Sequence, residues 1–322
     1  MTTFKVNSQN PLIVSSYFTQ KAIPLEVQQF NRALSEEMAK LPSLLNLSPQ
    51  EIRARDQNRA TKRSPSAIDR YITGLSGNKI KLHQFIPNKI KGVYLFIHGG
   101  GWISGAADWQ DTRLESIAIK GQIAVISIEY RLAPEYPYPA AVDDCEAVAL
   151  WLVENAAQEF GTSNILIGGG SAGAHLSVLT LLRMRDKHSY TQFKCANLVF
   201  GVYDLAMTPS MRNWGEKELI LSTPIVKRML DYFLPKEIDR YDPTVSPLYA
   251  YLQNMPPALF TIGTLDPLLD DTLFMYMRWL SAGNAADLVV CPGGVHGFVS
   301  MPTPQSDEAN AYVLEFLKSH CP

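Results

Sequence analysis

The 322-residue sequence lacks most of the features that mark special classes of protein. Its cysteines are few and widely spaced, with no CxxC pair and no histidine at the spacing of a zinc ligand. We therefore expect buried free thiols rather than disulfides or a metal site. The four are Cys145, Cys195, Cys291 and Cys321. Neither sign of charge predominates, since 29 basic and 31 acidic residues leave a formal net charge of −2. Nothing in this balance favours binding to nucleic acid or to an anionic membrane.

Long apolar runs are absent as well. No stretch approaches the roughly 20 apolar residues that a membrane-spanning helix needs, so no span is predicted. Residues 1–7 have neither the basic nor the apolar segment of a secretion signal, and we expect a cytoplasmic protein. No fixed-period repeat or low-complexity tract interrupts the chain. With 46% hydrophobic and 19% charged residues, the sequence predicts one large core, alone or with a small accessory piece.

What is present, from about residue 92, is an alternation of short β-branched runs with helical patterns. This alternation predicts an α/β fold with a mostly parallel sheet covered by helices on both faces. The expected strands are 93–97, 123–128, 165–167, 198–200, 258–262 and 288–290, and the expected helices are 140–154, 172–185, 268–282 and 307–318. Upstream, residues 68–72 and 80–85 alternate apolar and polar side chains around a turn at 76–78, which predicts an antiparallel hairpin at a sheet edge.

Two segments depart from this alternation, residues 1–50 and residues 205–245. The first is predicted to be helical, with Pro24 near a helix start. In the second, Thr223 and Pro224 resemble an N-cap and the first turn of an amphipathic helix. Both segments are explained equally well by surface helices packed on the core and by a helical cap over a pocket. We expect the cap, placed over a main domain made of residues 51–204 and 246–322.

Two glycine-rich segments carry the chemistry. Gly169-Gly170-Ser171-Ala172-Gly173 fits G-x-S-x-G between an apolar run and a helical pattern, which is the strand–turn–helix context of a nucleophilic serine. His98-Gly99-Gly100-Gly101-Trp102 fits a loop whose backbone N–H groups bind an oxyanion. A serine hydroxyl is a weak nucleophile on its own. Ser171 therefore needs a base, a group that orients the base, and donors for the charge that it creates.

The base must be one of six histidines. His296 follows the last predicted strand, where the chain order Ser…Asp…His places the base. His98 is expected to hydrogen-bond its own loop, and His175 is expected to pack near the helix that follows Ser171. The remaining three, His83, His188 and His320, are interpreted as ordinary strand or surface residues.

The orienting carboxylate should follow the penultimate strand. Asp266 lies there, at a position that would also suit a helix N-cap. Asp270 and Asp271 are competitors, but both fall within the helix that follows. The donors of the oxyanion hole are expected to be the backbone N–H groups of Gly100, Gly101 and Ala172, where glycine lets the backbone approach a ligand closely.

With these motifs assembled, the chain resembles the hormone-sensitive-lipase-like branch of α/β hydrolases, also called bacterial family IV esterases. The resemblance covers the chain from its helical N-terminal part to the last helix, and its motifs occur in one order: HGGGW at 98–102, YRLAPE at 130–135, PYP at 137–139, GxSAG at 169–173, DPL at 266–268 and HGF at 296–298. It implies a triad of Ser171, Asp266 and His296. The implied reaction is hydrolysis of carboxylic esters, usually with short to medium acyl chains, without a metal or organic cofactor.

One position departs from the family pattern, because the family usually has G-D-S-A-G and this chain has Gly170 in place of the aspartate. The position is outside the implied triad, and its effect on hydrogen bonding and substrate preference is left open. The YRLAPE segment is interpreted as a structural turn that braces the active-site loops.

Three alternatives stay open at this point. The first is an arylformamidase or another amide hydrolase, because HGG-W loops also occur in formamidases. The second is a ligand receptor like the plant gibberellin receptors, although these lack the histidine present here at position 296. The third is a long-chain lipase, and the lack of a secretion signal argues against it. A small-molecule ester is the expected partner, and analogy with the family makes a homodimer built on the last strand and helix one expectation.

Overall fold

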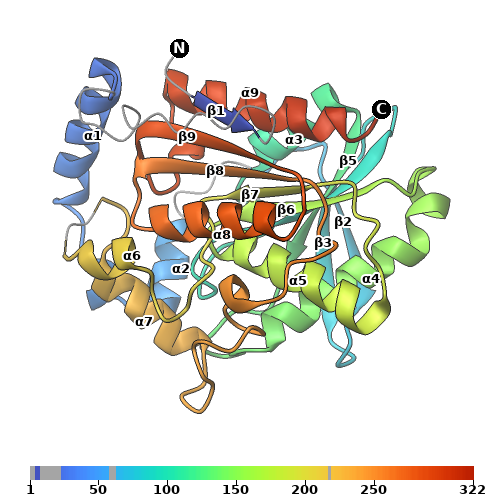
Figure 1. Cartoon of the computed structure of the whole chain (residues 1–322), viewed down its shortest axis with the longest axis horizontal. Coiled ribbons are helices and arrows are strands. Elements are labelled where there is room, and N and C mark those ends of the chain that lie inside the picture. The colour runs from blue at the N-terminus through green and yellow to red at the C-terminus, as the bar shows by residue number, and fades with distance from the viewer. Residues whose placement is uncertain (1–3, 8–22, 58–62, 217–218) are drawn as a thin grey trace.

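A computed structural model describes residues 4–7, 23–57, 63–216 and 219–322, and Figure 1 draws the others as a thin grey trace. Within the described residues, nine strands form one sheet in the order β1-β9-β8-β7-β6-β4-β5-β3-β2. Their bounds are Phe4–Asn7 (β1), Ile68–Thr73 (β2), Lys79–Phe85 (β3), Gly92–Ile97 (β4), Ile123–Glu129 (β5), Ile165–Gly170 (β6), Ala196–Val199 (β7), Ala258–Leu265 (β8) and Ala286–Val295 (β9). The α/β fold expected from the sequence is confirmed.

The sheet is parallel in its centre and antiparallel at its margins. Strands β5, β4, β6, β7, β8 and β9 pair in parallel, which confirms the βαβ units. The β2–β3 hairpin lies at one edge, as predicted, and β1 pairs antiparallel with β9 at the other. All residues of β4 and β7 are buried, as expected for strands covered on both faces. The four cysteines are buried thiols outside any disulfide, also as predicted.

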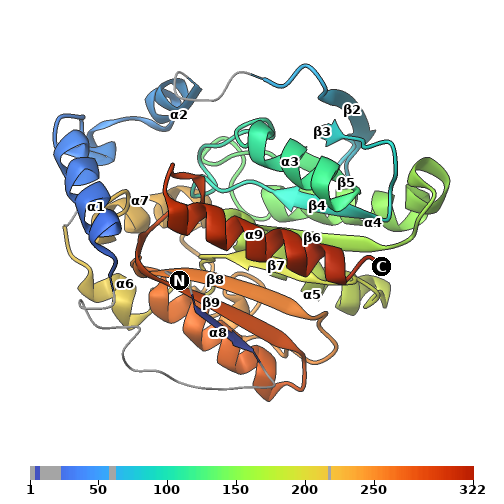
Figure 2. The ribbon, with the colours of Figure 1, turned by 90° about the horizontal axis from the view of Figure 1, so that it is seen from above.

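Five helices cover the two faces of the sheet (Figures 1 and 2). Helices α3 (Asp111–Gly121) and α9 (Pro304–Ser319) lie on one face. Helices α4 (Ala140–Phe160), α5 (Ala172–His188) and α8 (Leu269–Ser281) lie on the other. The predicted helices are found with slightly shifted ends. The core is therefore a three-layer sandwich whose middle layer carries the continuous apolar strands.

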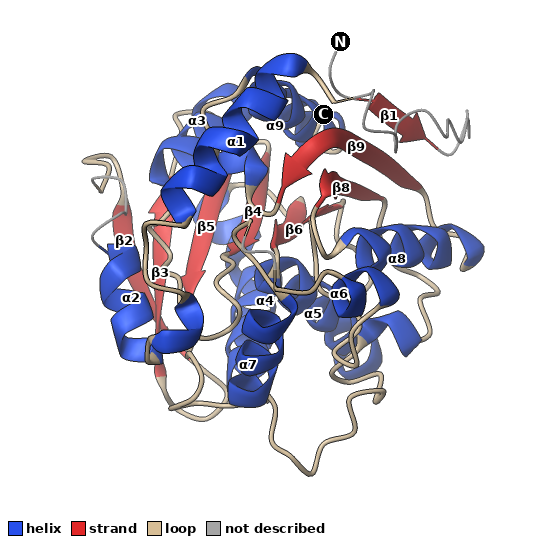
Figure 3. Ribbon diagram, turned by 90° about the vertical axis from the view of Figure 1, so that its left-hand side faces the viewer, coloured by secondary structure: helices blue, strands red, loops and turns tan. Residues whose placement is uncertain are grey.

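The remaining helices gather at the end of the sheet where the parallel strands finish, and Figure 3 views the molecule from this end. They are α1 (Leu25–Met38), the short 3₁₀ helix η3 (Leu44–Asn46), α2 (Pro49–Gln57), α6 (Pro209–Asn213) and α7 (Thr223–Phe233). Two further 3₁₀ turns, η4 (Pro247–Tyr249) and η5 (Phe298–Ser300), occur in loops. Helix α1 begins directly after Pro24, as predicted.

Three details differ from the expectation. Phe4–Asn7 is a strand, because its backbone completes the edge of β9, although the segment was predicted to be helical. The N-cap of α7 is Ser222, and the Thr223 hydroxyl instead donates to the Met211 carbonyl at 2.7 Å. Phe200, expected inside a strand, lies just beyond β7 with a φ of +37°. The predicted helical structure of residues 8–22 lies outside the described residues.

Candidate active site

Ser171 sits on a sharp turn between β6 and α5. Its φ of +57° is uncommon for a residue with a side chain, and such strain is maintained only where the surroundings fix it. The Ser171 N–H donates to the Val199 carbonyl at 2.9 Å. Glycine is required on both sides of the turn: a Cβ would lie 2.2 Å from the Ile97 carbonyl oxygen at Gly169 and 2.0 Å from it at Gly173. The close approach of three backbone segments thus turns the serine hydroxyl outward.

His296 and Asp266 meet this serine. His296 Nε2 lies 3.0 Å from Ser171 Oγ, and His296 Nδ1 lies 2.9 Å from Asp266 Oδ2. The exposed fraction is 1% for Asp266 and 7% for His296, so the hydrogen bond between these two residues is shielded from water. The three residues follow β6, β8 and β9, whose carboxyl ends lie at the same edge of the sheet. The fold thus brings together the nucleophile, base and orienter expected from the sequence.

Asp266 also serves its own turn, because its Oδ1 accepts a hydrogen bond from the Leu268 N–H at 2.9 Å. The two competing aspartates have other partners. Asp270 accepts from the Ser210 N–H, and Asp271 accepts from the backbone N–H of Tyr203 and from the Thr208 hydroxyl. Burial raises the pKa of Asp271 to about 7. Both competitors therefore hold the segment after β7 against α8 rather than the imidazole of His296.

The glycine-rich loop approaches the same site in backbone conformations that only glycine adopts readily. Gly100 has a φ of +116°, and a Cβ there would lie 2.2 Å from the Ser104 carbonyl oxygen. Gly101 has a φ of +58°, and a Cβ there would lie 2.4 Å from Met229 Sδ of helix α7. Ala172 is the first residue of α5, where a helix leaves its N–H groups unpaired and concentrates positive potential. These positions suit donors for a developing anion.

Trp102 anchors the end of this loop. Its indole stacks on Phe233 with ring centroids 4.5 Å apart and an angle of 13°, and its Nε1–H donates to His175 Nδ1 at 3.1 Å. Burial lowers the pKa of His175 to about 4, so the ring is neutral and accepts this bond. His98 Nδ1 donates to the Gly99 carbonyl at 2.7 Å. These contacts agree with the packing and loop-binding expected for His175 and His98.

The YRLAPE segment braces the loop from behind. The Tyr130 hydroxyl donates to the His98 carbonyl at 3.0 Å, and the Ala133 N–H donates to the Trp102 carbonyl at 2.9 Å. Arg53 of α2, which sequence reasoning missed, donates to the carbonyls of Ile103 and Ala133, each at 2.7 Å. It also forms a 2.6 Å ion pair with Glu135. Helix α2 is thereby fastened to the loop, and no spacing in the sequence signals this contact.

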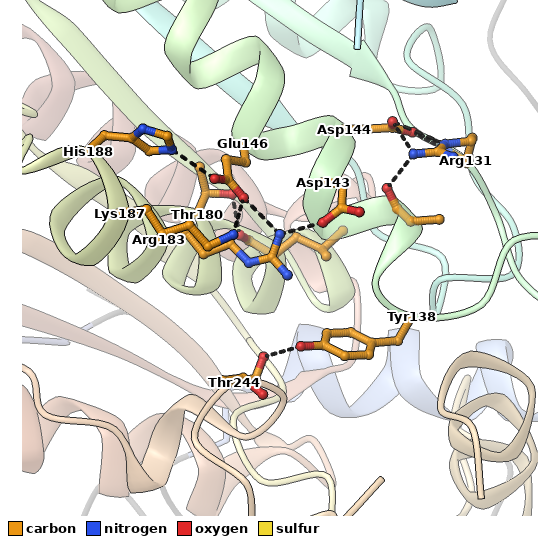
Figure 4. Close-up of polar contacts among 12 residues, drawn as sticks. Arg131, Tyr138, Asp143, Asp144, Glu146, Thr180, Arg183, Lys187, His188 and Thr244 are labelled. Atoms are coloured by element: carbon orange, nitrogen blue, oxygen red, sulfur yellow. Dashed lines mark hydrogen bonds and ion pairs between the residues drawn. The ribbon is translucent and has the colours of Figure 1, made fainter. Parts of the chain in front are cut away.

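A charged cluster fastens the helix that carries the nucleophile turn (Figure 4). Glu146 of α4 contacts Arg183, Lys187 and His188 of α5 at 2.8, 3.0 and 2.8 Å. Burial opposes the ionisation of Glu146, but the hydrogen bonds from these three groups outweigh it and lower its pKa. Arg183 also pairs with Asp143 at 2.6 Å. The cluster holds α5 against α4 well away from Ser171, which indicates a structural role.

The site opens into a cavity of about 410 Å³, a size typical of small-molecule sites. Ser171 and His296 line it together with apolar side chains of the end helices, among them Met38, Val226 and Met229. In the part of the chain that the structure describes, no group of three or more His, Cys, Asp or Glu is arranged to hold a metal ion. No helix there is both long and apolar enough to cross a membrane.

Known proteins share both the sequence and the architecture. Residues 94–300 match the family described as having the alpha/beta hydrolase fold. The carboxylic ester hydrolase LipN of Mycobacterium tuberculosis is 36% identical over 216 residues, which are 65% of this chain and 57% of LipN. The carboxylesterase NlhH of the same organism is 32% identical over 234 residues, covering 70% of this chain and 73% of NlhH.

A solved structure extends the likeness to almost the whole chain. The hyperthermophilic esterase from the archaeon Pyrobaculum calidifontis is 26% identical, with a TM-score of 0.84 over 90% of this chain and 97% of its own. The family match, the relatives and this structure agree with the motifs of the sequence. The chain therefore belongs to the α/β-hydrolase family, in its hormone-sensitive-lipase-like branch of carboxylesterases.

Proposed function

We propose that this carboxylic ester hydrolase acts through Ser171 as nucleophile, His296 as general base and Asp266 as the orienting carboxylate. His296 Nδ1–H donates to Asp266, which leaves the Nε2 lone pair to take the Ser171 proton. Ser171 Oγ then attacks the ester carbonyl, and the imidazolium returns its proton to the departing alcohol. Water attacks the acyl-enzyme by the same route and releases the acid. The observation that carries the proposal is the 3.0 Å distance between His296 Nε2 and Ser171 Oγ.

The negative charge of the tetrahedral intermediate is taken up by backbone N–H groups of Gly100, Gly101 and Ala172. Two observations support this role: the glycines hold backbone conformations that expose the loop to the cavity, and Ala172 starts a helix. In related mechanisms, removal of one such donor costs about 2.7–4 kcal/mol of barrier stabilisation. The three together therefore account for a large share of the rate.

We further propose that the described helices within residues 1–50 and 205–245 form the cap of the active site, over a catalytic domain of residues 51–204 and 246–322 whose sheet Phe4–Asn7 joins beside β9. Met38 and Leu44 line the cavity from the first segment, and Val226 and Met229 line it from the second. Their side chains make the roof apolar. Together with a volume of about 410 Å³, this supports short- to medium-chain esters as substrates.

The test compares Ser171→Ala with the wild type on p-nitrophenyl acetate and butyrate. Ser177→Ala is the matched control, because it removes a buried hydroxyl of the same helix that only donates to the Gly173 carbonyl. We expect loss of turnover and of fluorophosphonate labelling in Ser171→Ala alone, with both variants folded. Retained turnover in Ser171→Ala would exclude this serine as the nucleophile.

Two substrate series test the finer assignment. A series of p-nitrophenyl esters from acetate to palmitate should show its highest kcat/KM at short or medium length, and a maximum at palmitate would instead identify a long-chain lipase. N-formylkynurenine should react more slowly than the simple esters. The reverse order would identify an amide hydrolase of the same fold.

A further inference from the structure

Phe200 occupies an unusual backbone position beside the nucleophile. It follows β7, whose last carbonyl, that of Val199, accepts the Ser171 N–H, and its own N–H donates to the Thr261 carbonyl at 2.7 Å. Its φ of +37° is rare for a bulky residue and is costly unless the surroundings impose it. The Val199–Phe200 peptide is thus tied to the Ser171 turn through its carbonyl and to β8 through its N–H, and Phe200 lines the active-site cavity.

The ring of Phe200 packs against the imidazole of His296. The ring centroids lie 4.8 Å apart at an angle of 56°, and Phe200 is only 6% exposed. The bonds to Asp266 and Ser171 fix the two nitrogens of His296, but both lie along one line across the ring. They oppose tilting about that line only weakly, since hydrogen bonds tolerate such rotation. A bulky ring packed 4.8 Å from the centre of the imidazole restricts this tilting sterically.

Gly170 makes room for this ring. A Cβ at position 170 would lie 3.1 Å from Phe200 Cε2, which is closer than side chains normally pack, and 3.6 Å from its Cζ, an ordinary contact distance. An aspartate here, as in the family pattern, would add a carboxylate beyond that Cβ. The glycine and the phenylalanine therefore form one arrangement: the missing side chain at 170 leaves the space that the ring needs beside His296.

We propose that Phe200 is a positioning residue that holds the imidazole of His296 in line with Asp266 and Ser171, and that Gly170 is required for it. The inference rests on the proposed triad. Phe200 takes no part in proton transfer itself. It reduces the number of imidazole orientations that cannot react, which raises kcat without changing how a small substrate binds.

The first experiment measures kcat and KM of Phe200→Leu on p-nitrophenyl acetate, whose small acyl group needs little of the pocket. We expect kcat to fall about tenfold, a change equivalent to about 1.4 kcal/mol, with KM changed less than about twofold. Phe200→Tyr keeps the ring and should retain most of the wild-type kcat. Phe193→Leu removes another buried phenylalanine, one that packs on Tyr190, and should leave both constants unchanged.

The second experiment is a double-mutant cycle between positions 170 and 200. Gly170→Asp alone should lower kcat, because the new side chain displaces the Phe200 ring from His296. In a Phe200→Leu background the same substitution should cost little more, so that the two effects are not additive. Additive effects, or a Phe200→Leu enzyme with unchanged kcat, would overturn the positioning role. An inactive wild type, or an active Ser171→Ala enzyme, would instead overturn the proposed triad.

Discussion

His83 and His296 are both buried histidines that contact aspartates, yet their surroundings suit opposite purposes. His83 is 0% exposed and lies between two carboxylates, with Nδ1 2.9 Å from Asp69 and Nε2 2.8 Å from Asp111. His296 has a carboxylate on Nδ1 only, and Nε2 faces the hydroxyl of Ser171 beside a cavity.

The difference lies in the second nitrogen. Both nitrogens of His83 are taken up by carboxylate oxygens, so neither of them faces a hydroxyl that it could deprotonate. His83 therefore ties the hairpin strand β3 to the start of α3, where Asp111 also accepts the Ser64 N–H. Burial and a carboxylate partner alone do not identify a catalytic histidine. The other nitrogen must also lie within hydrogen-bond distance of a hydroxyl, and the histidine must have access to a pocket.

The largest expected effect comes from removing the charge that orients His296. Asp266→Asn offers an amide N–H where the imidazole N–H needs an acceptor, which favours the wrong tautomer. We expect kcat on p-nitrophenyl butyrate to fall by about 10⁴. Asp270→Asn, on the adjacent helix, should change kcat less than about twofold. If kcat of Asp266→Asn falls by less than tenfold, Asp266 is not part of the triad.

The corresponding change at His83 should act on stability instead. His83→Leu leaves the carboxylate of Asp111, which is 1% exposed, without its partner. We expect the free energy of unfolding in urea to fall by about 3–5 kcal/mol. The kcat of the folded fraction should stay at the wild-type value. If His83→Leu is too unstable to purify, Asp111→Asn provides the same measurement, and a large loss of kcat in either folded variant would contradict the structural role.

His175 provides a third buried histidine and a test by pH. Burial lowers its pKa to about 4 from 6.5, so the folded state favours the neutral ring. The stability that it contributes is complete above about pH 6.5 and is lost as the pH falls toward 4. Between pH 6.5 and 4, the free energy of unfolding should therefore fall by about 2–3 kcal/mol less in His175→Gln than in the wild type, as measured by urea unfolding at each pH. Parallel pH curves would show that His175 does not cause the loss.

The smallest effect is expected at the outer partner of His83. The Arg63 guanidinium and, to a lesser degree, His83 lower the pKa of Asp69 from 3.8 to about 2. The stability that ionised Asp69 contributes is present above about pH 3.8 and is lost as the pH falls through 2. Arg63 is 45% exposed, so solvent screens its ion pair with Asp69. Asp69→Asn should therefore lower the free energy of unfolding in urea by at most about 1 kcal/mol at pH 7. The difference between variant and wild type should shrink as the pH approaches 2. A constant difference would mean that the charge of Asp69 is not involved.

The parts of the candidate site that could be predicted are those whose residue types are set by neighbouring residues in the sequence or by strand order. Ser171 and the glycines around it follow from a turn that excludes side chains, and strand order was enough to select Asp266 and His296. The contacts of Arg53 and Asp271 could not be predicted in this way. Their partners lie far along the chain, at Glu135 and Thr208, and no short spacing marks such a contact.

The fold was predictable for a related reason. Each central strand is a continuous apolar run, and burial on both faces leaves that pattern in the sequence. The Phe4–Asn7 strand has no such pattern, because four residues at an edge are fixed by the strand beside them. Phe200 was placed inside a strand since its apolar character suits one, whereas contacts across the site give it a left-handed backbone.

That edge strand bears on assembly. In register with Asp287–Val290, β1 pairs with the outer side of β9, where the central sheet would otherwise present unpaired backbone groups. A second copy could continue the sheet through β9 only after these four residues had been displaced or exchanged between the subunits. Along Asp287–Val290, the addition of a second copy's β9 would therefore compete with the chain's own first strand, and the homodimer expected by analogy would need that strand to move or to be exchanged.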